Sequence, residues 1–164
     1  MKKVLFTITA ILAVGCLVAF TLPAESTPTT TTNNEETNIT WYTWEEAIEL
    51  NKTAPRKLFI DLYTDWCGWC KRMDASTFKD PAVVKHLNEN YYPIKFDAEQ
   101  KEEILYNEHT FKFIDQGRRG IHELAYSLLD GQLSYPSYVY LDEQVRRITI
   151  SKGYKEAPAM IKEL

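Results

Sequence analysis

The sequence predicts an α/β domain with a mixed central sheet and helices on both faces. Strand and helix patterns alternate over 39–97, an order typical of parallel strands joined by helices. The strand patterns "SYVYL" (137–141) and "VRRITI" (145–150) are separated by three residues, so they are expected to pair antiparallel. "KLFIDLY" (57–63) is apolar on both faces, as in a central strand covered from each side.

The first expected elements precede that central strand. A short strand is predicted over 39–42. Thr43 and Glu46 have capping-box spacing ahead of an apolar periodic stretch, which predicts that a helix begins directly after Thr43. This helix is expected to end in "TAPRK" (53–57), where a proline interrupts the pattern.

Four further elements complete the predicted sheet and its cover. A helix opens near Cys67, and Asp80 with Pro81 starts another helix in which the aspartate is the cap. "YYPIKFD" (91–97) predicts a further strand, and 157–164 has the apolar spacing of a last short helix. The predicted order is strand–helix–strand–helix–strand, an insertion, and then strand–strand–helix.

The insertion, 98–134, has predicted elements of its own. "EILYNEHTFKFI" alternates polar and apolar residues around Asn107 and Glu108, which predicts a hairpin with a two-residue turn. The apolar residues of 121–128 follow helical spacing, and Gly131 is the expected stop.

The first 24 residues have the pattern of an export leader. Lys2 and Lys3 precede a long uncharged apolar run. Three interpretations stay open: a signal peptide cleaved after Ala24, a lipoprotein leader lipidated at Cys16, or an uncleaved membrane anchor. Each of them places the domain outside the cytoplasm, in the periplasm or at the cell envelope, and the last two tether it to a membrane.

Composition bounds the rest of the chain. Residues 25–38 contain no large apolar side chain and are interpreted as a disordered linker, so the domain spans 39–164. Its hydrophobic content, 45% for the whole chain, is enough for a packed core. The net charge is −4 and no long basic cluster occurs, which argues against a nucleic-acid partner.

The cysteine pair in "DWCGWCKR" is the strongest chemical signal. Cys67 and Cys70 are the only pair outside the leader, and a disulfide that closes so short a loop would stabilise the fold little. A structural zinc ion usually takes four Cys or His ligands. His86, His109 and His122 lack ligand spacing and are each expected at a surface or interface. The pair is therefore interpreted as redox-active, with no metal.

The position of the pair assigns a role to each sulfur. The first cysteine of C-x-x-C stands at a helix N-terminus, where free N–H groups and the helix dipole favour the thiolate. Cys67 is thus expected to attack a partner disulfide. Cys70 lies one turn further on and is expected to resolve the mixed disulfide.

Three neighbours of the pair are candidate site residues. Asp61 interrupts an apolar strand, so we expect a buried carboxylate with a raised pKa that takes the proton from Cys70. A half-exposed position at the strand end is the alternative. Trp66 and Trp69 flank the pair, either as a contact platform and shield or as ordinary packing residues.

The motifs together resemble the thioredoxin superfamily. "KLFIDLYTDWCGWCKRM" (57–73) has its apolar strand, buried Asp, W-C-x-x-C and helix. Tyr135-Pro136 is similar to the cis-proline element of that superfamily, and "SKGY" (151–154) to the glycine region before its last helix. The resemblance covers about 39–164.

The stretch 76–99 resembles one branch more closely, the branch that includes the C-terminal domain of the transmembrane disulfide reductase of bacterial envelopes. This implies a redox-active Cys67–Cys70 disulfide, a cis Pro136 packed beside it, and a Tyr135 backbone that pairs with an extended substrate. The residues expected to contact substrate are Trp66, Gly68, Trp69 and Tyr135.

The resemblance implies a thioredoxin fold and an exported thiol–disulfide oxidoreductase that reduces protein disulfides without a cofactor, supplied by a membrane or envelope electron donor. A disulfide oxidase or isomerase, a non-catalytic adaptor and a thiol metallochaperone are the alternatives. Two departures matter. Gly-Trp replaces the Gly-Pro of thioredoxin between the cysteines, and the insertion either shapes a partner surface near Pro136 or only extends the sheet edge.

Overall fold

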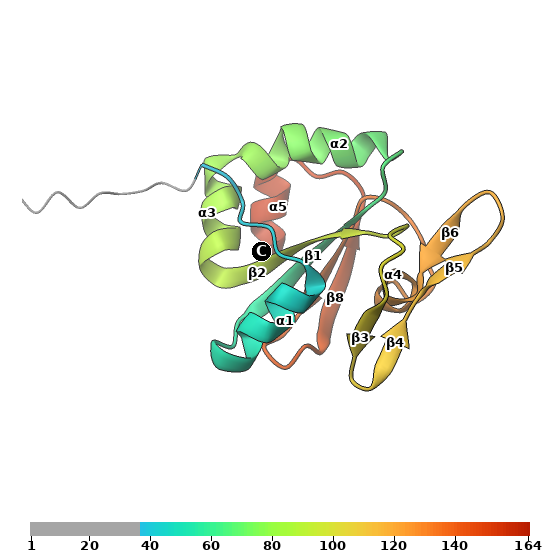
Figure 1. The fold of residues 1–164 in the computed structure, drawn as a ribbon. Coiled ribbons are helices and arrows are strands. Elements are labelled where there is room, and N and C mark those ends of the chain that lie inside the picture. Colours follow the sequence, from blue (N-terminus) through green and yellow to red (C-terminus); the bar gives the residue numbers. More distant parts are fainter. Residues whose placement is uncertain (1–36) are drawn as a thin grey trace, which may run out of the picture. The chain divides into compact units, whose positions relative to one another are not determined.

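A four-stranded sheet organises residues 37–164, the part of the chain that the computed structural model describes (Figure 1). Its order is β2-β1-β7-β8, with β1 at Lys57–Tyr63, β2 at Tyr91–Asp97, β7 at Ser137–Leu141 and β8 at Arg147–Lys152. β1 and β2 are parallel, whereas β1–β7 and β7–β8 are antiparallel. The predicted mixed sheet and α/β class are confirmed. The predicted leader, its lipidation site and nearly all of the predicted linker lie outside the described residues.

Four helices pack on the sheet close to their predicted positions. They are α1 (Trp44–Thr53), α2 (Gly68–Ala75), α3 (Pro81–Asn90) and α5 (Ala157–Glu163), and the short 3-10 helix η1 (Thr77–Lys79) follows α2. Thr43 and Glu46 form the predicted capping box, since each side chain accepts the other residue's backbone N–H. The Asp80 carboxylate accepts the N–H groups of Ala82 and Val83 and so caps α3.

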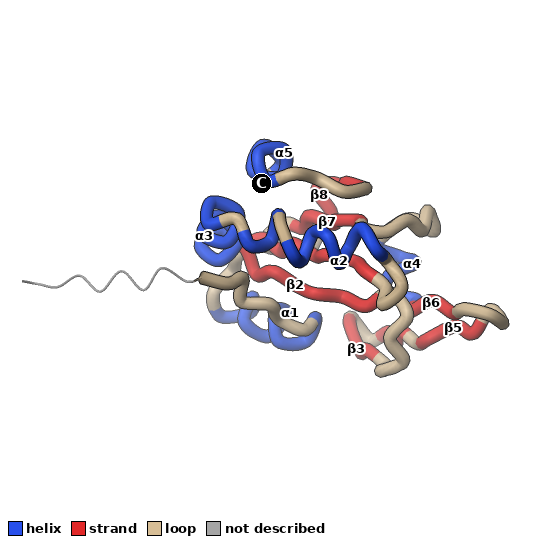
Figure 2. The backbone as a smooth tube through the Cα atoms, turned by 90° about the horizontal axis from the view of Figure 1, so that it is seen from above, coloured by secondary structure: helices blue, strands red, loops and turns tan. Residues whose placement is uncertain are grey.

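The sheet separates two apolar cores. Leu58 and Ile60 of β1 pack in one core with residues of α1, while Phe59 packs in the other with residues of α2, α3 and α5. In Figure 1, α2 lies above the sheet and α1 below it, and Figure 2 shows α2 running across the sheet from above. Because side chains alternate along a strand, Asp61 lies on the same side of the sheet as Phe59, the side covered by α2.

The predicted strand over 39–42 is wrong, because only Tyr42 pairs, in an isolated parallel bridge with Ile94. The N–H of Tyr42 donates to the Pro93 carbonyl at 2.8 Å. Two residues earlier the ladder would need an N–H from Pro93, which proline lacks. The N–H of Thr40 instead donates to the Asn88 side chain at 2.9 Å.

The insertion contains the predicted hairpin and a second one. β3 (Ile104–Tyr106) and β4 (His109–Phe111) pair around Asn107 and Glu108, whose φ values of 49° and 64° fit a two-residue hairpin turn. β5 (Phe113–Asp115) and β6 (Gly120–His122) form the second, which the sequence analysis did not predict. Both hairpins lie outside the main sheet.

Helix α4 (Glu123–Leu128) begins later than its apolar spacing predicts, because Ile121 belongs to β6. The ring of His122 accepts the N–H of Leu124 at 3.2 Å and caps the helix directly before Glu123. At the other end, Gly131 has a φ of 70° and its N–H donates to the Tyr126 carbonyl at 2.9 Å. The left-handed conformation explains the glycine at this stop.

Candidate active site

The two cysteines are joined in a disulfide at the start of α2, with a Cα–Cα distance of 5.3 Å. A turn closed by the bond from the Cys67 N–H to the Thr64 carbonyl, 3.0 Å, connects the end of β1 to the pair. Cys67 is the N-cap residue, and its Sγ accepts the N–H of Cys70 at 3.0 Å. Both residues are almost fully buried, with 4% and 2% of their surface exposed. A partner molecule must therefore contact the surrounding residues in order to reach the two sulfurs.

This environment favours a thiolate on Cys67 once the disulfide is reduced. A helix N-terminus carries partial positive charge and unpaired N–H groups. The N–H of Cys70 already points at the Cys67 sulfur, so it stays available to a negative charge there. The structure thus places Cys67 where the sequence analysis expects the attacking sulfur.

Asp61 is buried, with 1% of its surface exposed, and is not at a half-exposed strand end. One carboxylate oxygen accepts from the Lys95 Nζ at 2.6 Å, whereas its Oδ1 has no hydrogen-bond partner among the described residues. Burial raises the pKa of Asp61 to about 6; the Lys95 ammonium lowers it and the Asp74 carboxylate raises it. Such a carboxyl group exchanges protons close to neutral pH.

Lys95 joins two acids on the α2 side of the sheet, since its Nζ contacts both Asp61 and Asp74 of α2. Burial favours neutral lysine, but the two carboxylates outweigh burial and leave the pKa of Lys95 raised. The sequence analysis missed Lys95 and Asp74. One signal pointed to Lys95: it is the only charged residue in the interior of β2, whose other charged residue, Asp97, is at the strand end, and the parallel register pairs Lys95 directly with Asp61.

Both tryptophans beside the pair are too exposed for ordinary packing residues. Trp66 is 50% exposed and Trp69 57%. The ring centroid of Trp66 lies 6.0 Å from that of Tyr135, edge to face, and Trp69 lies 5.3 Å from Tyr154. At Gly68, between them, an added Cβ would meet no atom within 4 Å. These residues form an open aromatic surface around the disulfide.

The Tyr135–Pro136 peptide bond is cis and directly precedes β7. Pro136 is buried, and its carbonyl accepts the N–H of Gly153 at 2.8 Å. Burial, with smaller contributions from Glu99 and Asp97, raises the pKa of the half-buried Tyr135 to about 12, so its hydroxyl stays neutral. The bond to Gly153 ties the proline segment to the loop before α5, and this loop also carries Tyr154, the neighbour of Trp69.

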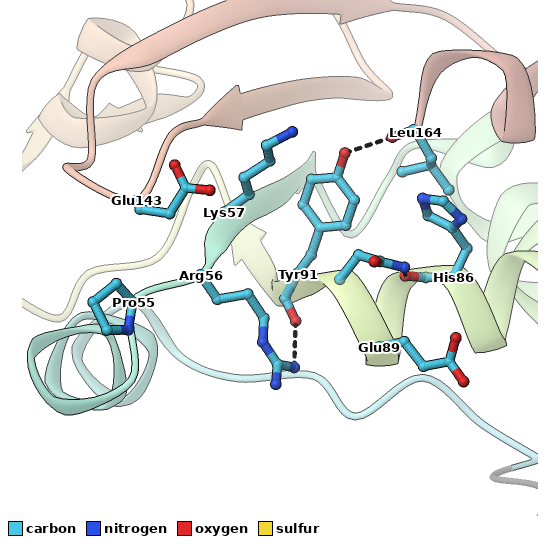
Figure 3. Close-up of a pocket in the computed structure, with 9 residues that line it drawn as sticks. Pro55, Arg56, Lys57, His86, Glu89, Tyr91, Glu143 and Leu164 are labelled. Atoms are coloured by element: carbon cyan, nitrogen blue, oxygen red, sulfur yellow. Dashed lines mark hydrogen bonds between the residues drawn. The ribbon is translucent and has the colours of Figure 1, made fainter.

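The cleft drawn in Figure 3 is separate from the cysteine pair. It has a volume of about 340 Å³ and includes Lys57 and Tyr91, the first residues of the parallel strands β1 and β2. The disulfide follows the last residue of β1, so the cleft lies at the opposite end of the strands. The Tyr91 hydroxyl donates to the Leu164 carbonyl there, and the Arg56 guanidinium donates to the carbonyl of Tyr91.

The other predictions for this region concern histidines, metals and membranes. His122 is fully buried, so its expected surface position is wrong: its ring packs against Phe96 and lies 3.0 Å from the Glu102 carbonyl.

Over 37–164, no group of three or more His, Cys, Asp or Glu side chains is arranged to hold a metal ion. No helix within the same residues has the length and apolar character that crossing a bilayer requires.

Comparisons with known proteins point to one family. The model of the family described as "Thioredox_DsbH: Protein of unknown function, DUF255" matches residues 22–151. An uncharacterized protein of Caenorhabditis elegans is 33% identical over 67 residues, which are 40% of this chain and 9% of that protein. The thiol:disulfide interchange protein DsbD of Pectobacterium atrosepticum is 49% identical over 35 residues, 21% of this chain and 6% of that protein. The matched stretch is thus less than a tenth of either relative.

Solved structures show the same fold. A structure of a DsbH oxidoreductase has a TM-score of 0.54 and 16% identity, and the match covers 77% of this chain and 82% of the other. A thioredoxin from Thermus thermophilus has a TM-score of 0.57 and 16% identity, with 77% and 84% covered. The predicted thioredoxin fold is therefore confirmed.

Proposed function

Since this chain belongs to the thioredoxin-like family described as Thioredox_DsbH, DUF255, we propose that it is an exported thiol–disulfide oxidoreductase that reduces disulfides in other proteins. The family and the Cys67–Cys70 disulfide support a redox function. The observation that carries the proposal is the position of Cys67 at the N-cap of α2, with its sulfur accepting the Cys70 N–H. The direction, reduction, rests on the likeness to the DsbD segment.

The reaction transfers two electrons from the protein's dithiol to a substrate disulfide. The Cys67 thiolate attacks one sulfur of the substrate, which forms a mixed disulfide and expels the other substrate sulfur as a thiolate. Cys70 then attacks the Cys67 sulfur, which releases the second substrate sulfur and forms the disulfide seen in the structure. A dithiol donor must reduce this disulfide again before the next turnover.

In this proposal Asp61 accepts the proton of Cys70 when that thiol becomes the attacking group. Asp61 lies on the α2 side of the sheet, and Cys70 is in the first turn of α2. With a pKa near 6, the carboxylate is mostly ionised at neutral pH and is available as a base. Burial raises that pKa, while Lys95 lowers it and Asp74 raises it, so these two act through Asp61 as positioning residues.

The aromatic surface around the pair is proposed to bind the substrate chain. Trp66 and Trp69 offer exposed apolar area, and the backbone at Tyr135, before the cis-proline, pairs with an extended substrate segment. Gly68 leaves room for the substrate to approach the sulfurs. The proposed setting is the periplasm or cell envelope, with a membrane-linked dithiol as electron donor and the leader as export signal or tether.

A redox titration tests the proposal. The protein is prepared with Cys16→Ser, so that only one thiol pair remains, and is equilibrated in thiol/disulfide buffers while tryptophan fluorescence is recorded. We expect a two-electron transition near the thioredoxin value of roughly −270 mV. A transition near roughly −120 mV would mean a disulfide donor instead. No transition would leave a non-catalytic adaptor.

Insulin reduction provides the matched functional assay. The protein with the pair intact is expected to catalyse it with a dithiol as donor. Cys67→Ser should abolish turnover, whereas Cys70→Ser should trap a mixed disulfide that a non-reducing gel separates. Unchanged turnover in Cys67→Ser would exclude the proposed mechanism.

A further inference from the structure

The β5–β6 hairpin of the insertion brings a cation to the tryptophan that precedes the redox pair. The guanidinium carbon of Arg119 lies 3.9 Å from the centre of the Trp66 ring. Arg119 belongs to the turn between β5 and β6, and Trp66 is bonded directly to Cys67. A guanidinium over an indole face is a favourable cation–π pair. The insertion therefore reaches the edge of the candidate active site.

The base of this hairpin is fixed to the domain. The N–H of His122 donates to the Ala98 carbonyl at 2.8 Å, directly after β2. The His122 ring is buried against Phe96, and Ile121 is 3% exposed. A hairpin anchored in this way has a defined direction, even though it lies outside the main sheet (Figure 1).

The turn that carries Arg119 is also closed by its own backbone. The Gln116 N–H donates to the Arg119 carbonyl at 3.2 Å, and the Gly117 N–H donates to the Asp115 carboxylate at 2.9 Å. At Gly120 an added Cβ would lie 2.0 Å from the Phe113 ring, so the next residue must be glycine. These contacts hold the arginine backbone in one place.

Trp66 is held by three groups and still keeps an open surface. Besides Arg119 over its ring, its indole N–H donates to the Glu99 carboxylate at 2.9 Å, and Tyr135 meets it edge to face. Half of the side chain nevertheless stays exposed. Two of the three partners, Glu99 and Arg119, come from the insertion.

We propose that Arg119 is a positioning residue, through which the β5–β6 hairpin holds Trp66 in the orientation that docks polypeptide substrates. The ligand class is a disulfide within a polypeptide, large enough to touch Trp66 while one of its sulfurs meets Cys67. A small-molecule disulfide, in contrast, needs to contact only the sulfurs of the cysteine pair in order to react. This inference rests on the proposed function, and it assigns the insertion to substrate selection.

The kinetic test compares a large and a small disulfide. In the full chain, Arg119→Ala is expected to raise KM for insulin by about two- to fivefold, with kcat retained. The rate with a small aromatic disulfide, such as the thiol reagent 5,5′-dithiobis(2-nitrobenzoate), should stay the same. Arg119→Lys keeps a cation near the ring and should recover part of the affinity. An equal loss with both disulfides would overturn the proposal, because Arg119 would then act on the cysteine chemistry.

The neighbouring arginine is the matched control. Arg118→Ala removes the same charge from the same turn and is expected to leave KM for insulin unchanged. If Arg118→Ala and Arg119→Ala raise KM equally, the hairpin acts by net charge and not by positioning Trp66. In a Trp66→Phe background, Arg119→Ala should add little further loss, since the two residues act as a unit.

A spectroscopic measurement separates this inference from the proposed function. Acrylamide quenching of Trp66, isolated as the difference from Trp66→Phe, should increase in Arg119→Ala and not in Arg118→Ala. Unchanged quenching overturns the positioning role even where insulin reduction is normal. If the parent protein fails to reduce insulin while quenching changes as expected, the proposed function fails, and with it the docking role.

Discussion

At the scale of single residues, two opposing effects set the charge of Asp61. Burial favours its neutral form and raises its pKa to about 6, while the ammonium of Lys95 favours the carboxylate. Asp74, on the same lysine, adds negative charge and raises the pKa. The outcome is an acid that is mostly ionised at neutral pH at a cost in folding free energy, which is a typical arrangement for a proton acceptor.

Asp61→Asn is therefore expected to stabilise the protein and slow it. The unfolded aspartate ionises near pH 3.9 and the folded one near pH 6, so wild-type stability falls as pH rises through this window. The variant lacks this pH-dependent loss. Above pH 6 its free energy of unfolding should exceed that of the wild type by roughly 1 to 3 kcal/mol, and below pH 4 the excess should be smaller. Urea denaturation of both proteins at several pH values measures this difference in stability. A variant less stable at pH 7.5 would contradict this account, as would full insulin-reduction activity.

Lys95→Met is expected to shift the pH dependence of activity. Without the ammonium, nothing offsets burial, and the pKa of Asp61 rises further. The acid inflection of the insulin-reduction rate should move up by about one pH unit or more. Lys85→Met, which removes an exposed lysine from α3, is the control and should leave the inflection in place.

At the scale of elements, the insertion depends on one buried histidine. The Nδ1 of His122 accepts the Leu124 N–H, so the proton of the neutral ring is on Nε2, which faces the Glu102 carbonyl. Burial lowers the pKa of His122. A second proton would take away the acceptor that caps α4, and the ring joins this helix to β6.

The protein is thus expected to lose stability in acid through the protonation of His122. The unfolded histidine binds a proton below about pH 6.5 and the folded one only at lower pH, so this contribution is complete above pH 6.5 and falls as pH drops. His122→Asn keeps a capping acceptor without titrating. Relative to it, the wild type should lose stability as pH falls from 8 to 5, which urea denaturation at several pH values measures.

Elements with local signals could be predicted from the sequence, and elements set by tertiary contacts could not. Thr43 and Asp80 mark helix starts through their own side chains, and Asn107 with Glu108 marks a turn. The β5–β6 hairpin has three-residue strands, and its Ile121 also fits the helical spacing that follows. The burial of His122 decides between the strand and the helix at this position, and no local sequence pattern indicates that burial.

The same division holds for the candidate site. The cysteine pair, the buried Asp61 and the two tryptophans follow from motif and pattern. Lys95 and Arg119 reach the site only through strand register and through the fold of the insertion. Predicting them needs the pairing of segments far apart in sequence.

At the scale of the whole molecule, we expect the fold not to depend on its disulfide. The two apolar cores lie on either side of the sheet, and neither includes a cysteine. The bond closes a loop between residues only three apart, which restricts the unfolded chain little. We therefore expect the domain to keep one architecture when the disulfide is reduced.

Cys67→Ser with Cys70→Ser is accordingly expected to fold. Its free energy of unfolding should fall by about 2 kcal/mol or less relative to the oxidised protein, measured by urea denaturation. The near-ultraviolet circular dichroism of the core aromatics should be retained. A double variant that fails to fold would assign the disulfide a structural role.

The first described residues join the domain at a defined place relative to the cysteine pair. The Asn38 side chain accepts from Lys79 of η1, and its carbonyl accepts from Asn88 of α3, so the chain enters beyond the C-terminal end of α2. The cysteine pair is at the other end of that helix, because Cys67 is the N-cap of α2. Residues 37 and 38 therefore join the domain at the end of α2 opposite to the cysteine pair, so a large polypeptide can approach the sulfurs without meeting this stretch of chain.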